Sequence, residues 1–119
     1  MRIKKGSRIL KLTLKEPWFS LELSGDKPFE LRDYGNAWIM SRLFDKDNKL
    51  REYDYILYTN GYGNHRPYFI CKFSGVVLLQ FTNIDIRYGN KIRLQVGYKE
   101  KKLMIINGPI VKRGNIKKV

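Results

Sequence analysis

The sequence has little thiol or imidazole chemistry, because Cys71 is its only cysteine and His65 its only histidine. A single cysteine excludes an internal disulfide and a thiolate metal cluster. A single histidine removes most zinc sites and the Ser-His type of nucleophilic site. The sequence also lacks a Walker-type loop and a G-x-G-x-x-G pattern after a strand. We therefore expect neither a metal nor a cofactor.

Long hydrophobic runs are also missing. No stretch approaches the roughly 18 apolar residues that a membrane span needs, and the basic first five residues are not followed by the apolar segment of a signal peptide. We therefore expect a cytoplasmic protein with no membrane association. The content of 43% hydrophobic and 13% aromatic residues predicts a folded globule, not a disordered basic tail.

Acidic residues are scarce in the second half of the chain. Residues 1–60 carry 12 Lys and Arg against 9 Asp and Glu, whereas residues 61–119 carry 12 against only Asp85 and Glu100. The net charge of the chain is +13. A strongly basic half is typical of proteins that bind a polyanion, since each phosphate contact releases counterions. The charge favours a nucleic-acid partner over a protein that is basic only for solubility.

The length of 119 residues fits one domain. We expect a basic lead-in at residues 1–7, a single domain at residues 8–112 and a basic tail at residues 113–119. Alternating apolar and polar residues predict short strands. These are residues 8–14, 29–32, 53–59, 68–81 with a bend at Gly75, 84–88, 91–96, and finally 102–106 and 110–112 around a turn at 107–109. The predicted fold class is mostly β (α+β), a small barrel with two short helices near the N-terminus.

The two expected helices carry recognisable end signals. The first begins at Pro17, whose missing N–H is no loss at a helix start, and ends before Gly25, which suits a left-handed C-terminal cap. The second covers residues 37–44, with Asn36 as its N-cap.

Three residues that are often functional are expected to be structural here. Trp18 and Trp38 are expected to pack the two helices against the core and not to stack on a ligand. Cys71 lies in the middle of a predicted strand, so we expect a small, buried and inert side chain.

A short charged strand follows the first helix. Because apolar and charged residues alternate in Phe29-Glu30-Leu31-Arg32, we expect Phe29 and Leu31 to face inward and the two charged residues to face outward. Lys27 would lie at the mouth of this strand. The structural alternative is an ion pair at the surface between Glu30 and one of its basic neighbours, which would contribute little.

Residues 8–32 resemble the ASCH-domain family of the PUA-like superfamily. That family's pattern is a strand, a helix, the motif G-x-K-(T)-x-E-x-R and then a small β-barrel. Gly25, Lys27, Glu30 and Arg32 match the motif, and Pro28 stands where Thr or Ser is common. The resemblance implies a PUA-like barrel, in agreement with the strand pattern, and RNA more than DNA as its partner.

The resemblance also implies a possible hydrolase. In some ASCH proteins the lysine of the motif is implicated in hydrolysis of RNA or of a modified nucleoside, together with a hydroxyl and a carboxylate. Lys27 therefore carries over as a candidate catalytic residue, and a lysine serves as base or nucleophile when its pKa is lowered. Glu30, the second candidate catalytic residue, stands where the family has the hydroxyl, and no distal acid is evident.

A glycine-rich loop at residues 60–67 combines aromatic and basic residues. Aromatic rings that stack on bases, with Arg or Lys on phosphates, hold single strands without strict sequence readout. The alternative is that the tyrosines only fill the ends of the barrel. The candidate nucleic-acid-binding residues of the whole chain are Lys27, Arg32, Tyr62, His65, Arg66, Tyr68, Lys72 and Arg93.

Three functions are open from the sequence. The favoured one is binding of RNA or single-stranded nucleic acid in a cleft between residues 27–32 and residues 62–68. The second is a small hydrolase that acts on RNA or a modified nucleoside through Lys27. The third is an interaction protein whose charge suits an acidic protein partner. The sequence does not predict an oligomeric state.

Overall fold

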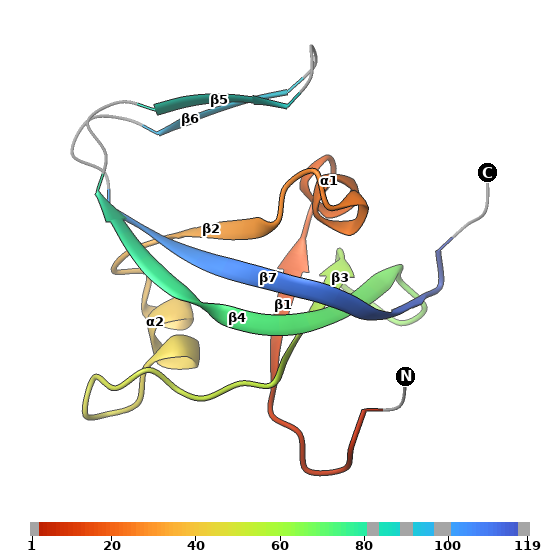
Figure 1. The fold of residues 1–119 in the computed structure, drawn as a ribbon, viewed down its shortest axis with the longest axis horizontal. Helices are drawn as coiled ribbons and strands as arrows, with labels where there is room; N and C mark the ends of the chain where they lie inside the picture. The colour runs from red at the N-terminus through yellow and green to blue at the C-terminus, as the bar shows by residue number, and fades with distance from the viewer. Residues whose placement is uncertain (1–2, 81–83, 89–91, 97–100, 117–119) are drawn as a thin grey trace.

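The fold is mostly β, with two short helices near the N-terminus, as the sequence predicts (Figure 1). The computed structural model describes residues 3–80, 84–88, 92–96 and 101–116. The elements in chain order are β1 (Ile9–Leu14), α1 (Trp18–Ser24), β2 (Phe29–Asp33), α2 (Ala37–Leu43), β3 (Tyr55–Asn60), β4 (Tyr68–Gln80), β5 (Ile84–Tyr88), β6 (Ile92–Val96) and β7 (Lys101–Gly114).

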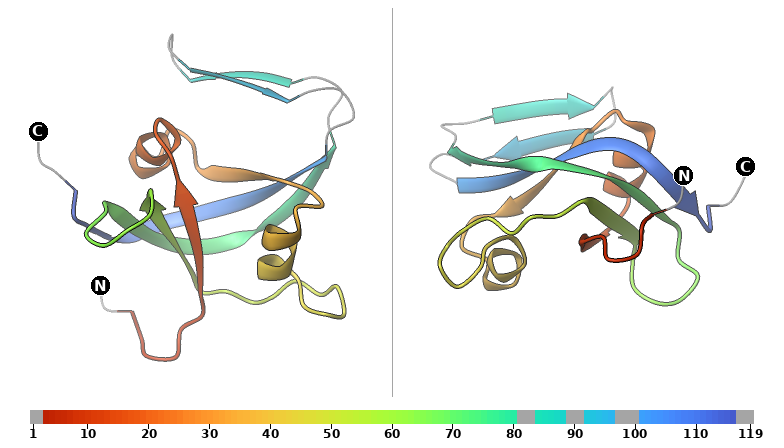
Figure 2. Two further views of the ribbon diagram at one scale, coloured as in Figure 1. Left: turned by 180° about the vertical axis from the view of Figure 1, so that it is seen from behind. Right: turned by 60° about the horizontal axis from the view of Figure 1, so that its bottom comes forward.

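Five strands form one sheet in the order β1-β3-β4-β7-β2, and this sheet curls into a half-barrel (Figures 1 and 2). β1 pairs with β3 in parallel, and the other neighbours in the sheet are antiparallel. β1 and β2 are therefore the two edges of the sheet. We call the gap between these two edge strands the seam.

The hydrophobic core fills the inside of the curl. In β1 the side chains of Leu10, Leu12 and Leu14 are all buried, so the predicted inward face of this strand is confirmed. Both helices pack against the sheet, and the Phe19 ring of α1 lies 5.3 Å from the Phe69 ring of β4, centroid to centroid. The other fully buried core side chains are Ile39, Leu43, Ile56, Tyr58, Cys71, Leu103 and Ile105.

The predicted helix ends are confirmed with one shift. Gly25 adopts a left-handed conformation with φ of 87° at the end of α1, as expected for a glycine cap. The Asn36 side chain accepts a hydrogen bond of 3.1 Å from the Ile39 N–H at the start of α2. Pro17 is the residue before α1 and not its first helical residue. Within the described residues, neither helix is long and apolar enough to cross a membrane.

The turn predicted at residues 107–109 is wrong, because β7 continues through it. The pairing of β4 with β7 shifts register between Ile70 and Val76 instead, so a bulge absorbs the irregular residues without ending the strand. Gly75 lies in this region with φ of 123°, which confirms the predicted bend. A Cβ at Gly108 would lie 3.0 Å from the Lys72 carbonyl oxygen, so this strand position needs glycine.

β5 and β6 form a separate two-stranded antiparallel sheet beyond the ends of β4 and β7 (Figures 1 and 2). Tyr88 pairs with Ile92 in this hairpin, close to the predicted bounds of the two strands. The tight turn that the sequence predicts at residues 89–90 lies outside the described residues.

Candidate nucleic-acid interface and a buried polar cluster

Two adjoining hollows lie along β1, and the larger also extends over β3 and the loop after it. The larger, of about 530 Å³, is lined by Lys11, Leu12, Thr13, Arg32, Trp38, Leu57, Thr59, Gly61, Tyr62 and Gly63. The smaller, of about 340 Å³, is lined by Ile9, Leu10, Lys11, Trp38, Arg42 and Tyr53. Because both hollows share Lys11 and Trp38, we treat them as one feature, the seam groove. Its lining contains the cations Lys11, Arg32 and Arg42, and none of the described residues that line it is acidic.

Two exposed aromatic rings flank the seam groove. Tyr62 is 86% exposed and Trp38 is 46% exposed. The prediction that Trp38 packs in the core is therefore wrong. Ile39 and Leu43 form the buried side of α2, and Trp38 lies beside that side of the helix. The Arg42 guanidinium lies over the Trp38 ring, 5.2 Å from its centroid.

Arg32 connects the seam groove to the interior. Its Nη2 atom donates a hydrogen bond of 2.9 Å to the Thr13 carbonyl oxygen, and its Nε atom donates one of 2.8 Å to Glu30 Oε2. The Arg32 side chain is 26% exposed, whereas that of Glu30 is 8% exposed. One guanidinium therefore has one side in the groove and the other on a buried carboxylate.

The expectation that Glu30 and Arg32 face outward is wrong. Glu30 is only 6% exposed, and Phe29 and Leu31 are half-buried on the opposite face of β2. The reason is that the first helix and the turn after it supply polar partners inside the curl. Charged residues of the strand can therefore face inward because each finds an opposite charge.

The centre of this polar cluster is Lys27, whose side chain is 4% exposed. Its Nζ atom lies 3.4 Å from Glu30 Oε1 and 3.6 Å from Glu22 Oε2. The Trp18 ring covers it with a centroid 4.7 Å from Nζ, and the Phe29 ring lies at 5.4 Å. Two carboxyl groups and two aromatic rings therefore enclose the ammonium group, since rings attract cations through their faces.

Glu22 is a member of the polar cluster that sequence reasoning missed. Burial, and then the charge of Glu30, raise the pKa of the Glu22 carboxyl from 4.5 to about 9. A usable signal was present, because Glu22 lies three residues after Phe19 and thus on the buried side of α1.

Asn107 and Tyr58 complete the cluster and were also missed. The Asn107 Nδ2 group donates a hydrogen bond of 2.9 Å to Glu22 Oε1. The Tyr58 hydroxyl donates one of 2.6 Å to Asn107 Oδ1. Burial, followed by the charges of Glu22 and Glu30, raises the pKa of Tyr58 well above its ordinary value. The three side chains come from α1, β3 and β7, so only the folded sheet brings them together.

The other predicted site residues are spread over the molecule. His65 and Arg66 are exposed in the glycine loop, where Arg66 Nε donates to the Asn60 carbonyl oxygen at 2.7 Å. Tyr68 starts β4, and its ring lies so close to Gly114 that a Cβ there would be 2.5 Å away. Lys72 is exposed farther along β4.

Arg93 lies in β6, opposite Arg87 in the hairpin register. Its side chain is outside the described part of the structure. Of the eight residues predicted to bind nucleic acid, the structure thus brings Arg32 and Tyr62 to one groove. It buries Lys27 behind that groove, leaves His65 and Arg66 exposed in the same loop as Tyr62, and leaves Lys72 exposed on β4.

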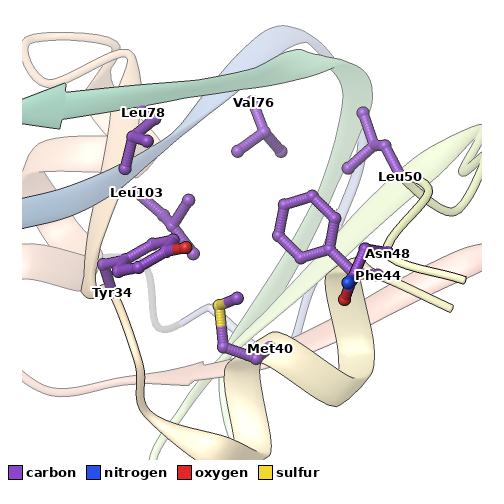
Figure 3. Close-up of a pocket in the computed structure, with 8 residues that line it drawn as sticks. All are labelled: Tyr34, Met40, Phe44, Asn48, Leu50, Val76, Leu78 and Leu103. Carbon is purple, nitrogen blue, oxygen red and sulfur yellow. The ribbon is translucent and has the colours of Figure 1, made fainter. Parts of the chain in front are cut away.

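A third hollow, of about 560 Å³, lies between α2 and the β4–β7 strand pair (Figure 3). Its lining is apolar apart from the Tyr34 hydroxyl and the Asn48 amide; the other residues are Met40, Phe44, Leu50, Val76, Leu78 and Leu103. None of the residues predicted to bind nucleic acid lines this hollow.

Among the described residues, no group of three or more His, Cys, Asp and Glu side chains is arranged to hold a metal ion. Comparisons of the chain with protein-family models, with curated proteins and with solved structures find no match. Membership of the ASCH family therefore stays a prediction from residues 8–32. The function has to be inferred from the geometry of the seam groove and of the polar cluster.

Proposed function

We propose that this protein binds single-stranded nucleic acid along the seam groove, with RNA favoured over DNA by the resemblance of residues 8–32. The observation that carries the proposal is the groove itself. It combines cations from three elements, Lys11, Arg32 and Arg42, with two exposed aromatic rings and no acidic residue among its described lining.

Phosphates and bases are suited to different parts of the groove. Lysine and arginine side chains neutralise backbone phosphates, whereas exposed rings such as Trp38 and Tyr62 stack on unpaired bases of any sequence. The net charge of +13 adds long-range attraction for the strand. We therefore expect salt-dependent binding with little sequence preference.

The test is fluorescence anisotropy with a labelled RNA of about ten nucleotides, its DNA counterpart and the matching duplex. Three phosphate contacts predict that the logarithm of affinity falls with the logarithm of salt concentration with a slope of about −2. Lys11→Ala is expected to weaken binding and to reduce that slope by about 0.7. Lys46→Ala removes the same charge from the exposed loop after α2, outside the groove, and is expected to change neither quantity by a comparable amount.

Failure of all three nucleic acids to bind at low salt would overturn the proposal and favour an acidic protein partner. Tighter binding to duplex than to single strands would also contradict it, because the bases of a duplex are not free to stack on Trp38 and Tyr62.

A second candidate function is hydrolysis of RNA or of a modified nucleoside through Lys27. The observation that favours it is the contact of the Lys27 ammonium with two carboxyl groups, one of which, Glu22, has a pKa raised by burial. This arrangement offers an acid beside an amine, which is what general acid–base chemistry uses. A substrate would have to displace the Trp18 or Phe29 ring to reach the enclosed Nζ atom.

Product analysis separates the two functions. After incubation with the protein, the RNA and any released nucleoside are examined by chromatography and mass spectrometry, for wild type and Lys27→Ala. Intact RNA supports the binding module. Turnover that disappears in a folded Lys27→Ala variant with unchanged RNA affinity would establish the hydrolase.

A further inference from the structure

One edge of β1 is unpaired in the described sheet. β1 pairs only with β3, and the Leu14 carbonyl oxygen accepts a hydrogen bond of 2.9 Å from the Gly61 N–H on that side. At the other end of the strand the Arg8 carbonyl oxygen accepts one of 3.2 Å from the Tyr55 N–H. The main-chain groups of successive residues alternate between the two sides of a strand. Those of Lys11 and Thr13 therefore point away from β3, into the seam.

The bond from Arg32 supports this orientation. Arg32 comes from the opposite edge of the sheet, and it meets the Thr13 carbonyl oxygen from the seam side. The Lys11 carbonyl and the Thr13 N–H lie next to each other on the same side of the strand. They form an acceptor and a donor that no neighbouring strand of the described sheet uses.

An aromatic ring and two cations lie beside this acceptor–donor pair. Trp38 lines the same hollow as Lys11 and Thr13, and the Arg42 guanidinium lies over one face of the ring, 5.2 Å from its centroid. A planar ligand that hydrogen-bonds to the β1 edge would therefore have a ring within the same groove on which to stack. The side chains of Lys11 and Arg42 would neutralise the negative charge of the adjacent phosphates.

We propose that the Lys11 carbonyl and the Thr13 N–H hydrogen-bond to the Watson–Crick edge of one unpaired nucleobase, which stacks on Trp38. This inference rests on the proposed function and specifies how the ligand is held. Every common base has a neighbouring donor and acceptor on that edge. The site would therefore accept any base that turns its donor toward the Lys11 carbonyl and its acceptor toward the Thr13 N–H. It would reject a duplex, in which that edge of the base is already paired.

A second kind of ligand could use a free strand edge, namely an extended peptide that adds to the sheet. The nucleic acid is favoured because the flanking side chains are Lys11, Arg32, Arg42 and Trp38, which suit phosphate and base. A peptide would also need a long run of free edge, whereas Arg32 already occupies the Thr13 carbonyl.

The test uses short oligouridine RNAs that differ only at the base edge. N3-methyluridine keeps the ring and the phosphates but blocks the donor on the Watson–Crick edge. We expect wild type to bind the unmodified RNA about tenfold more tightly, since the loss of such a bond is worth roughly 1.4 kcal/mol. Trp38→Ala is expected to weaken binding and to remove the difference, and Trp38→Phe to keep most of it. Circular dichroism shows whether each variant is folded.

Tyr34→Ala is the matched control, because Tyr34 is also an exposed ring with a cation, Lys101, over it, and it lies outside the seam groove. It is expected to behave as wild type. Equal affinity for the two RNAs, with steep salt dependence retained, would overturn this inference and leave the proposed function standing. A wild-type protein that binds neither RNA would overturn both this inference and the proposed function. An oligoglutamate peptide that binds more tightly than RNA and displaces it would favour an acidic peptide as the partner of the groove and also overturn the inference.

Discussion

The Arg32 side chain donates a hydrogen bond of 2.9 Å to the Thr13 carbonyl oxygen and thereby joins two strands at opposite ends of the same sheet. β1 and β2 do not pair with each other in the described structure, so a side chain bridges the seam where a closed barrel would have a backbone ladder. The same guanidinium also holds Glu30, which contacts Lys27. The groove and the polar cluster therefore share one residue.

Removal of the Arg32 guanidinium is expected to destabilise the protein. Arg32→Ala deletes the bridge across the seam and leaves the mostly buried Glu30 with Lys27 as its remaining cation. Because Arg32 is partly exposed, we expect a loss of about 1–2 kcal/mol in the free energy of unfolding, measured by urea denaturation. Arg51→Ala removes an exposed arginine that bonds the Ser41 carbonyl oxygen, and it is expected to cost less than about 0.5 kcal/mol. Equal losses in the two variants would mean that the bridge has no special role.

Neutralisation of Lys27 is expected to be more costly. Lys27→Met leaves the carboxyl groups of Glu22 and Glu30 facing each other in a buried site without the ammonium between them. Removal of one partner from a buried ion pair typically costs about 3–5 kcal/mol. Glu30 keeps the Arg32 guanidinium 2.8 Å from its Oε2 atom, so addition of Glu30→Gln to Lys27→Met is expected to lower stability further, because it takes the carboxylate away from that cation. A double variant more stable than Lys27→Met alone would contradict this account of the cluster.

The raised pKa of Glu22 makes stability depend on pH. The folded protein keeps the proton up to a pKa of about 9, whereas the unfolded chain releases it near 4.5. The folded state therefore binds more protons between these two values, and stability falls as pH rises through that window, by at most about 1.4 kcal/mol per pH unit.

Glu22→Gln removes this titration and keeps an oxygen that can accept the bond from Asn107. We expect a flatter profile of unfolding free energy between about pH 5 and pH 9, measured by urea denaturation in a series of buffers. Glu16→Gln, at an exposed position before α1, should leave the slope of wild type. An unchanged slope in Glu22→Gln would show that the carboxyl is already ionised in the folded state.

Cys71 is expected to resist thiol reagents in the native protein. It is completely buried, and burial raises the pKa of its thiol to about 12, so the reactive thiolate is scarce. Titration with a chromogenic disulfide should detect no thiol in native buffer and one thiol per chain in denaturant. Native labelling at the rate of a free cysteine would contradict the burial of this strand.

The strands and helix ends were predictable because each depends on neighbouring residues. The alternation of Leu10, Leu12 and Leu14 specifies which face of β1 is buried, and Gly25 and Asn36 act within their own helices. The burial of Cys71 also followed from its position in the middle of a strand. These features need no knowledge of distant partners.

The candidate site was less predictable because it depends on contacts between distant elements. Alternation in β2 indicates two faces but not which one is buried, and the partners that draw Glu30 inward come from the preceding helix and turn. The turn expected at Asn107 is replaced by a bulge that only the pairing with β4 creates. Asn107 thereby stays in the sheet and reaches Glu22, 85 residues earlier in the chain.

The order β1-β3-β4-β7-β2 also has a consequence for how the chain acquires its structure. β2 is synthesised early, but its only neighbour in the described part of the sheet is the strand Lys101–Gly114. The strand that carries Glu30 therefore takes its place in the sheet only after residues 101–114 have been synthesised. Pairings so distant in sequence are slow to form, so we expect folding on the millisecond-to-second scale of non-local β proteins.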